Sequence, residues 1–231
     1  MTNVAGPRSV AVHIGADDLR HPRHAAWARP LSCRDTVERL ARLCQAAGIR
    51  TQQAMLGSDA TTGRARAAIE GSAAAVGPGG LLVLTFSGHS ERPVPGEHDG
   101  GWCLHDAAQR HVETAALLAA APASARIVVI ADTCYATACA ATFTGVPATT
   151  IVLAACAENQ ATLNYQHSEF VKRLERLTYP GGRANPDCRS YAWLRRELRT
   201  DTPDVERPDV RANHPVAMRQ RPFRPAPQRQ R

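Results

Sequence analysis

The sequence predicts an α/β domain with a mostly parallel β-sheet and helices on both faces. Apolar, β-branched runs alternate along the chain with segments whose apolar residues recur at helical spacing. Such alternation is typical of parallel sheets that are buried on both sides. A length of 231 residues, 44% of them hydrophobic, suits one such domain with a core of ordinary size.

Five segments are expected to form strands because each is a short apolar or β-branched run. The first, "SVAVHIGA", is of this kind, whereas "IRTQQAML" has one polar face. The expected strands are residues 9–16, 49–56, 81–86, 126–131 and 150–155.

Five further segments have the apolar spacing of helices. In "CRDTVERLARLCQAAG" the apolar positions include Val37, Leu40 and Leu43, and Gly48 ends the segment. A second segment, rich in small residues, ends at the turn "GPGG". The expected helices are residues 33–48, 58–77, 112–121, 168–178 and 190–199.

The composition disfavours several classes of protein. No stretch approaches the roughly 20 apolar residues that a membrane span needs. The first residues lack the charged and apolar regions of a signal peptide, so we expect a cytoplasmic protein with no membrane partner. The seven cysteines are then expected to be reduced, and the absence of a CxxC pair argues against structural zinc.

The net charge of +7 comes almost wholly from arginine, with Lys172 the only lysine. No acidic residue follows Asp209, so residues 201–231 are expected to be a flexible Pro/Arg-rich tail beyond a domain of residues 8–200. Such a tail could bind an acidic partner. Nucleic acid is disfavoured as that partner, because an Ala/Arg/Pro-rich composition already accounts for much of the arginine.

Two of the expected strands end in residues that carry chemistry. "LLVLTFSGHS" (81–90) ends with His89, and "RIVVIADTCYATAC" (126–139) carries Cys134 just past its apolar run. Because ligands bind at the carboxyl ends of parallel strands, these two side chains are expected at the same edge of the sheet. A histidine beside a cysteine can act as the base that makes the thiol nucleophilic.

These two segments resemble the caspase-like cysteine peptidases, in the metacaspase and bacterial orthocaspase branch, whose motifs are S-G-H-G and D-x-C-x-S-G. "SVAVHIGADD", "LSCRDTVERLARLCQAAGI", "DGGWCLHDA" and "TIVLAACAENQATLN" followed by "SEFVKRLERL" resemble other parts of that family in consistent order, over about residues 8 to 200. The resemblance implies a caspase-like three-layer sandwich with a six-stranded sheet. It also implies a cysteine endopeptidase.

The resemblance assigns roles to individual residues. His89 would be the general base and acid, and Cys134 the nucleophile. The backbone N–H groups of Ser90 and Cys134 would form the oxyanion hole.

The resemblance also implies an acidic S1 pocket, the pocket that holds the substrate residue before the cleaved bond (P1). Its lining would be Asp132, Asp35 and Ser87, with Cys33 as a further candidate. Carboxylates in a narrow pocket favour arginine or lysine at P1. By resemblance, the partner would be a protein substrate, for instance an effector encoded nearby in a bacterial defence or cell-death system.

The sequence departs from the family pattern at two places. Ser90 stands where the family has glycine, which keeps an N–H group but would be strained if the backbone there had a positive φ. Tyr135, Ala136 and Thr137 replace His-Ser-Gly after the nucleophile, so that turn is expected to differ. These departures support an alternative function, a caspase-like module with weakened catalysis that acts by binding partners.

No cofactor is expected. Some members of the family bind calcium through clustered aspartates, but near Cys134 the chain offers only Asp132. No lysine or arginine lies between Arg126 and Lys172, so an enzyme specific for basic residues could not cut itself there. We therefore expect a single-chain protein.

Alternative roles remain open for several residues. Cys103 with His105 and Asp106 is a rival pair, disfavoured because side chains two positions apart diverge. A metal site from Asp99, Asp106, His98 and His105 is disfavoured by its loose spacing. Asp132 and Asp35 could instead cap helices, and Trp102 could line the substrate groove or cover the sheet edge. Cys44, Cys139 and Cys156 are expected in the core. A flavodoxin-like nucleotide site would need a Gly-rich loop that "HIGADDLRHP" lacks.

Overall fold

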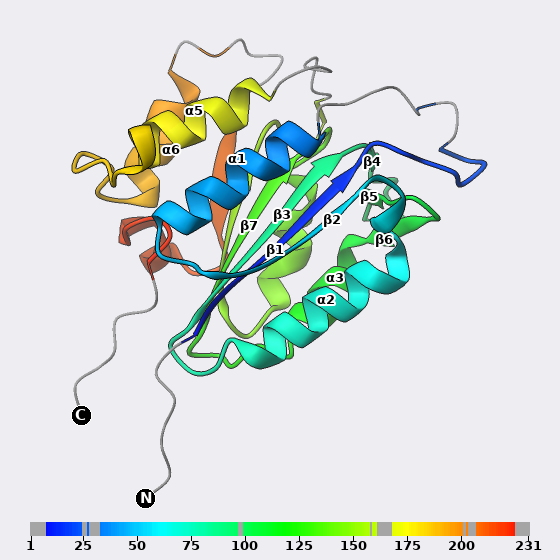
Figure 1. The fold of residues 1–231 in the computed structure, drawn as a ribbon, viewed down its shortest axis with the longest axis horizontal. Helices are drawn as coiled ribbons and strands as arrows, with labels where there is room; N and C mark the ends of the chain where they lie inside the picture. The colour runs from blue at the N-terminus through cyan, green and yellow to red at the C-terminus, as the bar shows by residue number, and fades with distance from the viewer. Residues whose placement is uncertain are drawn as a thin grey trace, which may run out of the picture.

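Two layers of helices cover a central six-stranded sheet in the computed structural model (Figure 1), which describes residues 8–24, 27, 33–96, 99–157, 159–160, 168–200, 202 and 207–224. The strand order is β2-β1-β3-β7-β8-β9, and every neighbouring pair is parallel except β8 with β9. The strands are β1 (Ser9–Ala16), β2 (Thr51–Leu56), β3 (Leu81–Gly88), β7 (Arg126–Asp132), β8 (Thr149–Ala154) and β9 (Asp209–Ala212). The predicted fold class is confirmed.

The polarity of each strand follows from its place in the sheet. The central strands β3 and β7 are buried along almost their whole length, which explains why their sequences are unbroken apolar runs. β2 lies at one edge and has exposed positions, so it tolerates the polar stretch "TQQ". All five predicted strands are present, with ends that differ from the predictions by at most two residues.

Of the helices in the described part of the chain, three α-helices cover each face of the sheet (Figure 1). On one face lie α1 (Cys33–Ala46), α5 (Glu169–Thr178) and α6 (Tyr191–Arg199), which bury Leu40, Leu174 and Leu194 against the sheet. On the other lie α2 (Thr62–Ala75), α3 (His111–Leu118) and α4 (Ala138–Thr142). Short 3-10 helices are η2 (Gly57–Asp59), η3 (Phe143–Gly145), η4 (Pro180–Gly182) and η6 (Pro215–Arg219).

A small antiparallel sheet follows β3, between the expected strand at 81–86 and the expected helix at 112–121, where no strand is predicted. It consists of β4 (Ser90–Glu91), β5 (Gly101–Cys103) and β6 (Ala108–Arg110). Trp102 of β5 is fully buried, and its ring stacks on Phe86 of β3 with 4.9 Å between ring centroids. Of the two roles considered for Trp102, the structure supports the one in which it covers the sheet.

Residues 207–224 belong to the domain, contrary to the expectation of a flexible tail from residue 201. β9 pairs with the outer side of β8, and Phe223 is buried in the core beneath α6. The N–H of Phe223 donates to the hydroxyl of Tyr191 at 3.1 Å. Buried Arg126 donates from Nη1 to the carbonyl of Arg224.

Among the described residues, the helices are all too short or too polar to cross a lipid bilayer.

Candidate active site

His89 and Cys134 follow the ends of two neighbouring parallel strands. The parallel pairing of β3 with β7 extends to Ser87, which lies opposite Asp132. His89 comes two residues after Ser87, and Cys134 comes two residues after Asp132. Neighbouring strands lie about 4.8 Å apart. The structure therefore brings His89 and Cys134 to the same edge of the sheet, and both are partly exposed there.

The glycine before His89 is required by the close approach of β1. A Cβ atom at Gly88 would lie 2.8 Å from the carbonyl oxygen of Ala16 and 2.9 Å from the ring of Phe86. The contact with the backbone of Ala16 could not be relieved without moving a strand. The carbonyl of His89 in turn accepts a hydrogen bond from the N–H of Cys103 at 2.9 Å. These contacts hold the backbone of His89 on both sides.

Ser90 lies in β4 opposite Trp102, in extended backbone, so the strain considered for this position does not arise. Because the N–H of Cys103 bonds to the carbonyl of His89, Ser90 and Trp102 form a non-hydrogen-bonded pair of the ladder. In such a pair the N–H of Ser90 points away from β5. This orientation suits a group that binds an oxyanion.

The side chain of Ser90 joins the two strand ends. Its hydroxyl donates a hydrogen bond to the carbonyl of Cys134, and the side chain is buried. A glycine at this position could not make the bond. The departure from the family motif therefore provides a contact that links the histidine segment to the cysteine segment.

The turn after Cys134 is held in an unusual conformation. Tyr135 has a φ of 53°, a left-handed conformation that costs on the order of 1 kcal/mol or more for a residue other than glycine. Its N–H donates to the carbonyl of Gln160 at 2.8 Å, and its carbonyl accepts from Ala138 at 2.9 Å. The chain after the cysteine is thus fixed at both ends of the turn.

Cys134 differs from the other cysteines in its exposure. All seven lie within the described residues, and the remaining six are buried. Burial raises the pKa of five of these thiols to about 12 and of the sixth to about 11: Cys33, Cys44, Cys103, Cys139, Cys156 and Cys188. Cys134 is therefore the thiol that an external reactant can reach.

Asp132 forms the centre of a polar cluster beneath this edge. Its carboxylate accepts hydrogen bonds from Ser87 Oγ at 2.9 Å and from Ser168 Oγ at 2.7 Å. Burial raises the pKa of Asp132, and the two hydroxyl donors offset only part of this effect. The cluster would therefore gain stability from a cation placed beside Asp132.

Cys33 belongs to the same cluster. It lies at the first turn of α1, is 1% exposed, and its thiol interacts with the side chain of Ser87. Its pKa is raised to about 12 by burial first and then by the nearby carboxylates of Asp17 and Asp132. The structure thus brings together three of the four residues predicted for an S1 pocket, Cys33, Ser87 and Asp132.

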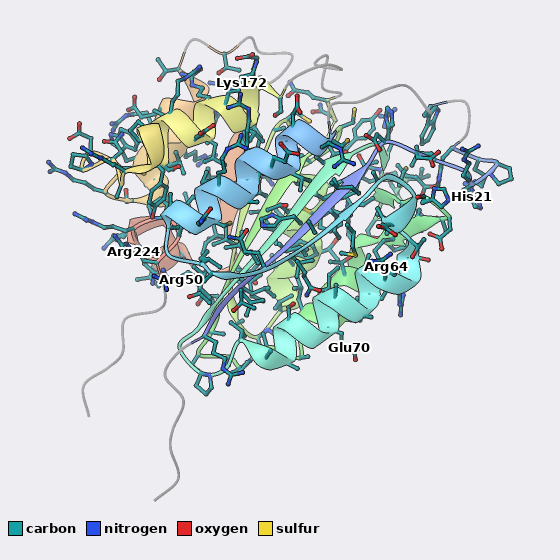
Figure 2. All side chains as sticks on the ribbon, viewed as in Figure 1. His21, Arg50, Arg64, Glu70, Lys172 and Arg224 are labelled. Atoms are coloured by element: carbon teal, nitrogen blue, oxygen red, sulfur yellow. The ribbon has the colours of Figure 1, made fainter. Side chains whose placement is uncertain are left out.

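Asp35, the fourth, lies on a different surface. Its side chain is exposed on α1 and lines a polar hollow with Glu38, Arg39, Arg42 and Lys172. Lys172 is labelled on α5 in Figure 2, so this hollow lies between the outer surfaces of α1 and α5. Asp35 is within the first helical turn and is not the N-cap, although its charge there is favourable.

Ser168 was missed from the sequence as a member of the site. It is the N-cap of α5, where its hydroxyl accepts from the N–H of Val171 at 3.0 Å. The serine before an apolar helical segment predicts this cap. Its second bond, to Asp132, depends on how α5 packs on the sheet and has no local signal.

The rival residues have structural roles. Cys103 is buried, and His105 Nδ1 is 2.7 Å from the carbonyl of Asp18. Asp106 accepts two hydrogen bonds from Thr62 at the start of α2. Asp132 does not cap α4, whose N-cap is Thr137.

Metal-binding clusters of three or more histidine, cysteine or acidic side chains are absent from the part of the chain that the structure describes. His98, one of the candidate ligands, lies outside the described residues.

Comparison with known proteins identifies the fold. No family model and no curated protein matches the sequence. A matching solved structure is the crystal structure of a Geobacter sulfurreducens protein, determined as a structural genomics target. It is 21% identical, covers 96% of this chain and 100% of its own, and superposes with a TM-score of 0.80. The chain is therefore similar over its length to a solved α/β protein, and this similarity establishes its fold.

Proposed function

We propose that the protein is a cysteine endopeptidase that cleaves peptide bonds after arginine or lysine. The observation that carries the proposal is the pairing of β3 with β7. Its register supports a placement of His89 and the partly exposed Cys134 at one sheet edge, two residues beyond Ser87 and the partly buried Asp132. A nucleophile, a base and a nearby acidic group at one edge of the sheet are what such a reaction needs.

The chemistry would proceed in two stages. His89 takes the proton of Cys134, and the thiolate attacks the carbonyl carbon of the scissile bond. The N–H groups of Ser90 and Cys134 stabilise the oxyanion. His89 then protonates the leaving amine, the C–N bond breaks, and a thioester remains on Cys134. A water molecule deprotonated by His89 hydrolyses this thioester and releases the acid product.

Specificity would come from the Asp132 cluster. The serine partners of Asp132 carry no charge, so a guanidinium or ammonium group at P1 would supply the positive charge that this partly buried carboxylate lacks. Binding of this cation would favour ionised Asp132 and so lower its pKa. The same cluster would disfavour an aspartate at P1, since two carboxylates would then lie side by side.

Hydrolysis of fluorogenic peptides that differ only at P1 tests the proposal. We expect turnover of the P1 arginine peptide, loss of at least about a hundredfold with Cys134→Ala, and no turnover of the P1 aspartate peptide. Cys188→Ala, which removes a buried thiol at the start of the segment leading to α6, serves as the matched control. Equal background turnover by wild type and Cys134→Ala would refute the enzyme. Binding of the basic peptide without cleavage would support the alternative, a partner-binding module.

A further inference from the structure

A second thiol lies close to Cys134 at the same edge of the sheet. β7 and β8 are in parallel register up to Ala131 opposite Ala154. The N–H of Ala155 continues this pairing by donating to the carbonyl of Ala131 at 3.0 Å. Two residues beyond Ala154, Cys156 falls opposite the residue that precedes Cys134 in the chain.

Hydrogen bonds fix the position of the Cys156 sulfur. Its Sγ lies 3.3 Å from the carbonyl oxygen of Thr133 and 3.2 Å from that of Gln160, and its single S–H proton is shared between these two acceptors. The Thr133 oxygen belongs to the peptide bond of Cys134 and lies about 2.8 Å from the Cα of that residue. The sulfur of Cys156 is therefore at most about 6 Å from the Cα of Cys134, so the two sulfurs can reach bonding distance after a small local movement.

The two thiols differ in ways that suit successive steps of oxidation. Cys134 is partly exposed, so a small oxidant can reach it. Cys156 is fully buried, and burial raises its pKa to about 12, so it does not react with the oxidant directly. A thiolate at Cys134 raises the pKa of Cys156 further, as expected for thiols at short distance. Cys156 lies in a bend after β8, where the backbone can adjust more easily than within a strand.

We propose that Cys134 and Cys156 form a reversible disulfide when a peroxide oxidises Cys134. The thiolate of Cys134 attacks one peroxide oxygen, the O–O bond breaks, and a sulfenic acid forms as hydroxide or alkoxide leaves. The sulfur of Cys156 then attacks the sulfenic sulfur. The S–O bond breaks as the S–S bond forms, and the departing hydroxide takes the Cys156 proton to give water. The two thiols together supply the two electrons that reduce the peroxide, and a dithiol reverses the reaction.

Cys103 is the competing partner, because its thiol also interacts electrostatically with Cys134. Its backbone, however, is held within β5, between pairing with Ala108 and the hydrogen bond to the His89 carbonyl. A bond from Cys103 to Cys134 would have to distort the small sheet. The Cys156 sulfur already contacts the carbonyl of Thr133, the residue before Cys134, so a Cys134–Cys156 bond needs the smaller movement.

Mass spectrometry after treatment with hydrogen peroxide tests this inference. The full chain is oxidised, its remaining thiols are alkylated under denaturing conditions, and the products are digested with chymotrypsin. Trypsin is unsuitable, since no lysine or arginine separates Cys134, Cys139 and Cys156. Chymotrypsin cuts after Tyr135 and Phe143 and so places the three cysteines on different peptides. We expect one linked pair, the Cys134 and Cys156 peptides, which separates after reduction with a dithiol.

Variants separate the possible outcomes. The linked pair should persist in Cys103→Ala and in the matched control Cys139→Ala, and disappear in Cys156→Ala and Cys156→Ser. In the Cys156 variants, Cys134 should instead be oxidised to the sulfinic acid several times faster than in wild type. Thermal melting of each variant shows whether it is folded. A Cys134–Cys103 pair, a link between two chains, or equal sulfinic acid in wild type and Cys156→Ser would overturn the proposal.

Discussion

Asp132 is a partly buried carboxylate whose described hydrogen-bond partners are hydroxyl groups. Ser87 and Ser168 donate to its two oxygens, yet burial still raises its pKa above that of an exposed aspartate. The ionised form is therefore less stable in the folded chain than in the unfolded chain. A carboxylate whose ionisation costs free energy in the folded chain is expected at a strand end where a bound ligand supplies a positive charge.

The first prediction concerns the stability of Asp132→Asn. A carboxyl whose folded pKa is raised destabilises the fold once the pH exceeds its unfolded value, and has no such effect below it. The variant should therefore be more stable than wild type at pH 7, by on the order of 1 kcal/mol, and gain nothing below about pH 3. Urea denaturation at both pH values measures this difference. A variant that is less stable at pH 7 would contradict it.

At the scale of elements, β4 links the His89 segment to the rest of the domain. Glu91, next to Ser90, is buried and accepts from His24 Nε2 at 2.8 Å and from the Arg110 guanidinium. Burial alone would raise the pKa of Glu91, but the His24 hydrogen bond and the charge of Arg110 outweigh it, so that the pKa is lowered. The ionised carboxylate therefore stabilises the strand that carries Ser90.

The second prediction is that Glu91→Gln destabilises the protein at neutral pH. A carboxyl with a lowered folded pKa contributes stability above its unfolded value, and this contribution disappears as the pH falls through the folded value. We expect a loss of about 2 kcal/mol at pH 7 that shrinks below about pH 4. The matched control is Glu70→Gln, at the exposed residue labelled on α2 in Figure 2. An equal effect of both variants on urea denaturation would contradict the role of Glu91.

At the scale of the whole molecule, the sheet is closed at one edge by the segment that the sequence predicts as a tail. β9 has four residues and follows an acidic, proline-containing stretch. Four residues are too few to show a clear apolar periodicity. The place of β9 in the sheet depends on the open edge of β8, more than fifty residues earlier. In contrast, β1, β3 and β7 are long apolar runs, and burial on both faces makes them predictable from composition alone.

The candidate site likewise contains residues that the sequence predicts and contacts that it does not. His89, Cys134, Ser87 and Asp132 were predictable because they follow strands whose carboxyl ends must meet at one edge. The exposure of Asp35 and the bond from Ser168 to Asp132 were not, since both depend on how α1 and α5 pack. The link from Ser90 to Cys134 likewise joins segments far apart in the chain.

The third prediction concerns removal of residues 207–231. Without them the edge of β8 loses its partner, and the core loses the buried ring of Phe223. We expect the shortened chain to aggregate or to melt at a much lower temperature than the full chain. Phe223→Ala alone should cost about 3 kcal/mol of unfolding free energy. A shortened chain with an unchanged melting temperature would show that the domain ends near residue 200, as the sequence predicts.

Covalent labelling of Cys134 tests the central claim most directly. A peptide with P1 arginine that ends in a thiol-reactive ketone is mixed with the folded protein, and the modified residue is identified after chymotryptic digestion. We predict one label per chain, on Cys134, with labelling strongly reduced by His89→Ala, by Asp132→Asn and by a P1 aspartate in place of arginine. Labelling of Cys134 at the same rate whatever the P1 residue, or without dependence on His89, would contradict the proposed site.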